Sequence, residues 1–89
     1  MNDLDKKISL ATEILSLSIE ISTNSIIDIF VDYSSHVKGL AIRVILNGWR
    51  NDTTYKDYDL DRLIHLDFKD SEKQLQEVLD YLKNLKEEL

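Results

Sequence analysis

The sequence predicts an α+β fold with the element order α-β-β-β-α, in which two helices pack on one face of a three-stranded antiparallel sheet. Apolar residues recur at helical spacing near both ends of the chain, and they alternate with polar residues in two central segments. An Asn-Gly pair follows the second of these segments. With 89 residues, no proline and no low-complexity segment, residues 1–89 are expected to form a single domain.

The first helix is expected over about residues 3–21, with Asn2 or Asp3 as its N-cap. Two apolar stripes run along it, so the apolar arc is wider than the ~100° that a helix needs to cover a sheet. We expect the first stripe to face the core. The second is expected to be covered by the other helix or by a partner chain, and both alternatives stay open. The first stripe comprises Leu4, Ile8, Ala11, Leu15 and Ile19, and the second Leu10, Ile14, Leu17 and Ile21.

Two strands are expected after residues 22–25, Ser-Thr-Asn-Ser, which should end the helix because short polar side chains compete for backbone hydrogen bonds. Alternation with a period of two over residues 26–33 and 40–46 predicts an antiparallel hairpin. The open face of the sheet is then predicted to be a protein-contact surface, because apolar residues lie there among charges. The alternation assigns Ile27, Ile29, Val31, Ile42 and Val44 to the covered face, and Phe30, Arg43 and Ile45 to the open face.

The third strand is less sharply defined by its pattern. Asn47 and Gly48 favour a tight turn, so the strand should begin near Trp49 or later, with the best alternation over residues 54–60. Residues 63–68 are compatible with a fourth strand, a continuation or a packed loop. Trp49 is expected to pack at the end of the hairpin, and an exposed contact residue is the alternative.

The closing helix has the clearest pattern in the chain. Ser71 with Gln74 three residues later is typical of a capping box at a helix N-terminus. A narrow apolar stripe follows, and the remaining faces are charged. The stripe comprises Leu75, Val78, Leu79, Leu82, Leu85 and Leu89.

Composition disfavours several functional classes. The chain has no cysteine, so neither a disulfide nor a thiolate zinc site is available, and a cytoplasmic location is expected. Its first residues are acidic, unlike a secretory signal, and no apolar run approaches membrane-spanning length, so no membrane partner is expected. Eleven Lys and Arg against 17 Asp and Glu give a net charge of −6, which disfavours direct binding of nucleic acid.

One acidic segment resembles a calcium loop in its spacing. Asp57, Asp59 and Asp61 alternate, as oxygen ligands do when they converge on a hard cation. The sixth and twelfth positions are Arg62 and Phe68, where such a loop needs glycine and glutamate. We therefore expect a solvated acidic segment and no metal site.

No residue pattern indicates catalysis. His36 and His65 are the only histidines, and neither has the spacing to a nucleophile or carboxylate that would mark an active site. The chain contains no glycine-rich phosphate loop. We expect no catalytic residue, no cofactor and no enzymatic activity.

The hairpin carries a further pattern in residues 29–37 (IFVDYSSHV), 42–44 (IRV) and 47–49 (NGW). Together with the leucine-rich final helix, these segments resemble small uncharacterised proteins of phages and prophages of Gram-positive bacteria. The resemblance implies a phage accessory protein that acts in the host cytoplasm, with no catalytic residues to transfer. Residues 57–68 are longer and more acidic than in such relatives, so the third strand is not covered by the resemblance.

Two functions are expected from these features. The first is a non-catalytic protein-interaction module that binds a protein partner or itself, as a homodimer. The second is an acidic inhibitor whose carboxylates take the place of phosphates in the nucleic-acid groove of a host enzyme. The candidate contact residues are Phe30, Ile45, Arg43, Leu10, Ile14, Leu17, Ile21 and Trp49.

Overall fold

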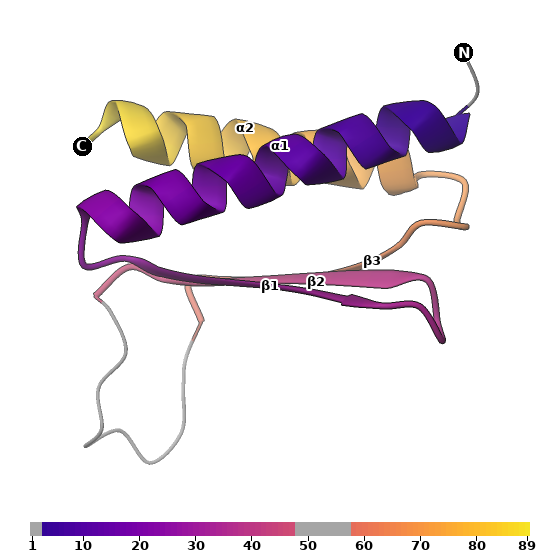
Figure 1. The fold of residues 1–89 in the computed structure, drawn as a ribbon, viewed down its shortest axis with the longest axis horizontal. Coiled ribbons are helices and arrows are strands. Elements are labelled where there is room, and N and C mark those ends of the chain that lie inside the picture. Colours follow the sequence, from indigo (N-terminus) through magenta and orange to yellow (C-terminus); the bar gives the residue numbers. More distant parts are fainter. Residues whose placement is uncertain (1–2, 48–57) are drawn as a thin grey trace.

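Helices form near the two ends of the chain and strands form between them, in the predicted order (Figure 1). The structure is a computed structural model and describes residues 3–47 and 58–89. Both helices lie on one face of the sheet, which confirms the predicted α+β fold. The elements are α1 (Asp3–Asn24), β1 (Asp28–Ser34), β2 (Gly39–Ile45), β3 (Leu60–His65) and α2 (Ser71–Glu87).

The sheet is antiparallel with the strand order β1-β2-β3, so β1 and β3 are its edges. Val31 lies opposite Ile42, and Phe30 lies opposite Arg43. Because side chains alternate between the faces of a sheet, the first pair faces the helices and the second faces away from them. The register therefore confirms the predicted division of β1 and β2 into a covered and an open face.

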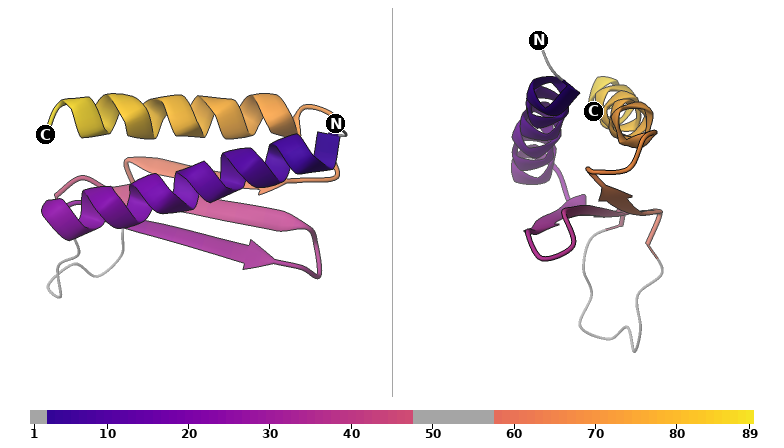
Figure 2. Two further views of the ribbon diagram at one scale, coloured as in Figure 1. Left: turned by 45° about the horizontal axis from the view of Figure 1, so that its top comes forward. Right: turned by 90° about the vertical axis from the view of Figure 1, so that its right-hand side faces the viewer.

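The core lies between the helices and the sheet. Figure 2 shows the helices side by side above the strands, with α1 over β1 and α2 over β3. Two ion pairs join the helices on their outer side, Lys86 with Glu20 at 2.7 Å and Lys83 with Glu13 at 3.9 Å. The buried cluster comprises Leu10, Ile14, Ile21, Ile27, Leu40, Ile42, Val44, Ile64, Leu75, Val78, Leu79 and Leu82.

The second stripe of α1 faces the core, so the prediction for the first stripe is wrong. Ile14 and Ile21 are 0% and 1% exposed, whereas Leu4 and Ile19 are 55% and 58% exposed. Helical spacing shows that two stripes exist, but the position of α2 decides which of them is covered. Burial removes Leu10, Ile14 and Ile21 from the candidate contact residues, and Leu17 packs against the same cluster.

Helix α1 ends at Asn24, three residues beyond the predicted boundary and within the serine-rich segment that was expected to end it. The hydroxyl groups of Ser18, Ser22 and Ser25 each donate to the carbonyl oxygen four residues earlier, at 2.7 Å. These bonds satisfy the hydroxyl groups within the helix, so they do not compete with it. The predicted N-cap at Asn2 lies outside the described residues.

Helix α2 begins at Ser71, but the predicted capping box is wrong. The N-cap is Asp70, and its side chain makes no capping hydrogen bond. The Ser71 hydroxyl group is buried and donates to the carbonyl oxygen of Leu66 at 3.1 Å, while the Gln74 amide group donates to the Asp70 carboxylate at 3.1 Å. Ser71 thus anchors the helix to the preceding turn.

Strand β3 begins at Leu60, which lies opposite Val44 and is the last residue of the segment with the best predicted alternation. Of residues 63–68, the first three belong to β3, and the others lie in the turn before α2. Trp49 and residues 54–57 lie outside the described residues.

Candidate functional site: an apolar groove between α1 and β1

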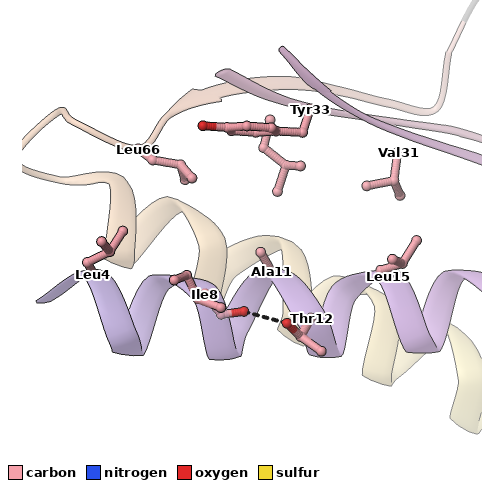
Figure 3. A pocket seen from close by; sticks show the side chains of 9 residues that line it. Leu4, Ile8, Ala11, Thr12, Leu15, Val31, Tyr33 and Leu66 are labelled. Atoms are coloured by element: carbon pink, nitrogen blue, oxygen red, sulfur yellow. Dashed lines mark hydrogen bonds between the residues drawn. The ribbon is translucent and has the colours of Figure 1, made fainter. Parts of the chain in front are cut away.

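An apolar groove lies between α1 and β1, with a volume of about 460 Å³. In Figure 3, Leu4, Ile8 and Leu15 project from α1 towards Val31 and Tyr33 of the sheet, and Leu66 lies at one end. We call this surface the α1–β1 groove. It is lined by Leu4, Ile8, Ala11, Thr12, Leu15, Val31, Tyr33, Leu40 and Leu66.

The first stripe of α1 forms one wall of the groove. Ile8 and Leu15 are 51% and 47% exposed, and Leu4 and Ile19 extend the stripe towards the two ends of the helix. The 15 residue steps from position 4 to position 19 correspond to about 22 Å along the helix axis. Single exposed aliphatic residues are common on monomers, but a continuous row of this length indicates a contact surface.

The groove opens because α1 is inclined to the sheet. In Figure 1, the C-terminal end of α1 lies closer to the strands than its N-terminal end. The Nζ of Lys7 donates to the carbonyl oxygen of Leu66 at 2.7 Å, which joins the raised end of α1 to the turn before α2. Tyr33 of β1 is 53% exposed and lines the groove beneath this raised end.

The described lining of the groove carries no charge. Its one aliphatic hydroxyl group, on Thr12, donates to the Ile8 carbonyl oxygen at 2.7 Å and is satisfied within α1 (Figure 3). The Tyr33 hydroxyl group is the other polar side-chain atom in this lining. The groove therefore presents mainly methyl groups and one aromatic ring to whatever occupies it.

The open face of the sheet provides less apolar surface than the sequence predicted. Phe30 is 38% exposed, but Ile45 is only 8% exposed, although neither belongs to the core beneath the helices. The Nε of Arg43 lies 3.2 Å from Asp61 Oδ1, and its guanidinium group lies 5.4 Å from the centre of the Tyr58 ring. Of the predicted contact residues on this face, Phe30 and Arg43 are accessible, while Ile45 is buried.

The described carboxylates of the acidic segment around the start of β3 are engaged within the chain. The Asp59 carboxylate accepts from the backbone amide of Leu46 at 2.7 Å, and Asp61 pairs with Arg43. Asp57 lies outside the described residues. Residues 3–47 and 58–89 contain no group of three or more side chains arranged to hold a metal ion.

The histidines and Tyr81 have different surroundings. His36 is exposed on the loop between β1 and β2. The His65 Nδ1 lies 3.2 Å from the Val37 carbonyl oxygen, and its ring lies 4.8 Å from that of Phe68. Burial, followed by the negative charges of Asp59 and Glu88, raises the pKa of the Tyr81 phenol.

Comparisons with protein-family models, with curated proteins and with solved structures found no match for this chain. The resemblance to phage proteins therefore stays a prediction, and the site is interpreted from its geometry. Neither helix in the described residues is long and apolar enough to cross a membrane.

Sequence reasoning missed the α1–β1 groove, although its signal was present. The apolar arc of α1 is wider than a helix needs to cover a sheet, so the sequence predicted that one of its two stripes requires a further cover. The surplus was assigned to the stripe of Ile14, whereas the structure leaves the stripe of Ile8 and Leu15 accessible. The alternation assigns the lining residue Val31 only to the covered face of the strand.

Proposed function

We propose that the protein is a non-catalytic interaction module that binds a segment of a partner protein in the α1–β1 groove. The observation that carries this proposal is the continuous row of half-exposed aliphatic side chains on α1 above Val31 and Tyr33. Following the resemblance drawn from the sequence, the partner would be a protein of the bacterial host in which a phage accessory protein acts.

A protein segment suits the groove better than a small molecule does. Small-molecule sites combine an enclosed apolar cavity with a few convergent polar groups that orient the ligand. Here the apolar wall continues past the groove to Ile19, and the Thr12 hydroxyl group is already bonded to its own helix. A long apolar surface without orienting groups favours contact with side chains of another chain.

Burial of the apolar stripe alone does not supply enough free energy to bind a partner. Full burial of an aliphatic side chain stabilises by about 1.5–3 kcal/mol, so completing the burial of a half-exposed one contributes about 1 kcal/mol. Four such residues contribute about 4 kcal/mol, while the loss of translational and rotational freedom costs about 4–15 kcal/mol. An occupant must therefore make further favourable interactions, which the edge of β1 can supply.

The open face favours an interaction module over the acidic inhibitor. An acidic inhibitor needs carboxylates in a continuous array that follows the spacing of phosphates. Arg43 lies at the middle of this face, opposite both Phe30 and Asp61, and its guanidinium group neutralises the Asp61 carboxylate. The cation interrupts the acidic surface at its centre.

Selection from a displayed library of random peptides tests the proposed function. The immobilised wild-type protein is compared with an Ile8→Lys/Leu15→Lys variant, which places two charges in the groove. A Ser9→Lys/Ser16→Lys variant adds the same charges at exposed neighbouring positions outside the described lining and serves as the control. Peptides should be enriched on the wild type and the control but not on the groove variant.

Two results would contradict this proposal. One is the absence of any enriched peptide whose binding depends on Ile8 and Leu15. The other is a wild-type dimer in sedimentation that dissociates in the groove variant but not in the control, since a second copy would then occupy the groove. Circular dichroism spectra of all three proteins should agree, because both substituted groove residues are about half exposed.

A further inference from the structure

We infer that the occupant of the α1–β1 groove is an extended strand, which pairs antiparallel with the free edge of β1 beneath α1 and alternates apolar with basic residues. This inference rests on the proposed function and names the conformation and chemistry of the partner segment. It is carried by three features of the fold: the direction of the β1 backbone groups, the position of α1, and the charge of β1.

The backbone groups at the free edge follow from the register. The Leu66 amide donates to the Lys38 carbonyl oxygen at 2.8 Å, next to the pair formed by Gly39 and His65. Hydrogen-bonded and non-bonded pairs alternate along an antiparallel ladder, so residues 40, 42 and 44 direct their backbone groups to β3, and residues 39, 41, 43 and 45 direct theirs to β1.

The same alternation continues into β1. In β1, residues 28, 30, 32 and 34 lie opposite residues 45, 43, 41 and 39 of β2, whose backbone groups point to β1. These four β1 residues therefore direct their own backbone groups to β2. Ile29, Val31 and Tyr33 therefore direct their backbone amide and carbonyl groups away from the sheet. Such an edge is a template for an added strand, whose backbone bonds supply the interactions that the apolar stripe alone lacks.

The position of α1 provides the space for that strand. Strands lie about 4.8 Å apart, and packed helices lie about 8–10 Å apart, so two helices are as wide as four strands. This sheet has three strands, with α1 over β1 and α2 over β3 (Figure 2). The outer half of α1 therefore extends beyond β1, and the stripe of Ile8 and Leu15 covers the place of a fourth strand.

The negative charge of this protein determines which residues suit the other face of the added strand. Side chains on alternate positions of that strand would lie on the open face of β1, where they reach the exposed carboxylate of Asp32. The chain as a whole carries a net charge of −6. Among the described residues, Arg43 lies opposite Phe30 on β2 and is paired with Asp61 on the side of β3. Lysine or arginine at these positions of the partner is therefore favoured, with apolar residues between them under α1.

A second copy of the chain does not fit this edge through its own β1. A symmetric antiparallel pair of β1 strands would bring the two α1 helices to about one strand spacing, near 4.8 Å. Packed helices need about 8–10 Å between their axes. The occupant is thus a segment of another protein that carries no helix above the strand.

A designed heptapeptide tests the inference. The probe is fluorescein-labelled Lys-Val-Lys-Val-Lys-Val-Lys with an amidated C-terminus, titrated with the protein and followed by fluorescence anisotropy. In the antiparallel pairing, the three valines lie under α1 and direct their backbone amides towards β1. N-methylation of the three valines should weaken binding at least tenfold. N-methylation of the lysines at peptide positions 3, 5 and 7 should change it less than threefold.

Charge and groove controls complete the experiment. A peptide with glutamate in place of each lysine should bind at least tenfold more weakly, and the Ile8→Lys/Leu15→Lys variant should not bind the parent peptide. Equal binding of the parent and the valine-methylated peptides would overturn the strand pairing. If library peptides bind in the groove but the heptapeptide does not, this inference fails while the proposed function stands.

Discussion

The Nζ of Lys7 in α1 donates a hydrogen bond of 2.7 Å to the carbonyl oxygen of Leu66, in the turn between β3 and α2. The bond joins residues 59 positions apart in the sequence. The same carbonyl oxygen accepts from the buried hydroxyl group of Ser71. One backbone oxygen thus connects both helices, and it holds the raised end of α1 at the height that leaves the α1–β1 groove open.

Replacement of Lys7 by methionine should destabilise the protein while keeping the length of the side chain. Loss of a partly buried hydrogen bond from a charged donor is expected to lower the free energy of unfolding by about 1–2 kcal/mol. Urea denaturation followed by circular dichroism measures the change. Lys6→Met, at an exposed position on the same turn, serves as the control and should stay within about 0.5 kcal/mol of the wild type.

The assignment of the two α1 stripes predicts a large destabilisation by alanine at Ile14 and a small one at the adjacent Leu15. Ile14 is 0% exposed, so Ile14→Ala should lower the free energy of unfolding by about 2–5 kcal/mol through lost contacts and a cavity. Leu15 is half exposed, and Leu15→Ala should cost less than about 1.5 kcal/mol. Chemical denaturation of both variants decides between the stripes. A larger cost at Leu15 than at Ile14 would contradict the observed orientation of the helix.

The position of Ser71 distinguishes a buried anchor from an N-cap. At an N-cap, aspartate replaces serine without loss because its carboxylate accepts from the first amides of the helix. Ser71 is instead 0% exposed and its hydroxyl group donates to the Leu66 carbonyl oxygen. Ser71→Asp should destabilise by more than about 2 kcal/mol, because a carboxylate cannot donate this bond and would be buried facing a carbonyl oxygen. The midpoint of thermal unfolding measures this effect. A Ser71→Asp variant as stable as the wild type would favour the capping box.

The raised pKa of Tyr81 predicts a dependence of stability on alkaline pH. Burial and the charges of Asp59 and Glu88 favour the neutral phenol, so the folded chain deprotonates above the ordinary pKa of 10.0. The stabilisation is fully present below that pH and is lost as the pH rises through the higher pKa of the folded state. Absorbance at alkaline pH should show one late tyrosine titration that is absent from Tyr81→Phe. The wild type should also lose stability more steeply than this variant above pH 10.

Local pattern predicted the hairpin and the closing helix correctly. In β1 and β2, the alternation of Val31 with Phe30 determines which face each side chain takes, because a strand has only two faces. In α2, the narrow stripe from Leu75 to Leu82 leaves one possible buried side. Where the pattern allows a single solution, the fold and the exposed position of Phe30 follow from the sequence.

The rest depended on tertiary contacts that no local pattern contains. Two stripes on α1 satisfy the same helical period, and only the packing of α2 buries Ile14 and leaves Leu15 accessible. The start of β3 is set by the pairing of Leu60 with Val44 across residues 46–59, which a turn signal at Asn47 does not reveal. The groove forms where α1 meets the edge strand β1. Its position depends on this tertiary contact, so a local pattern does not predict it.

Amide hydrogen exchange at Ile29, Val31 and Tyr33 tests most directly whether the α1–β1 groove receives a strand. With the heptapeptide at saturation, these three amides should exchange at least tenfold more slowly, since their edge-directed hydrogens become bonded. The amides of Phe30 and Asp32, which face β2, should change little and serve as the internal control. Unchanged exchange at Val31 in the saturated complex would contradict the account.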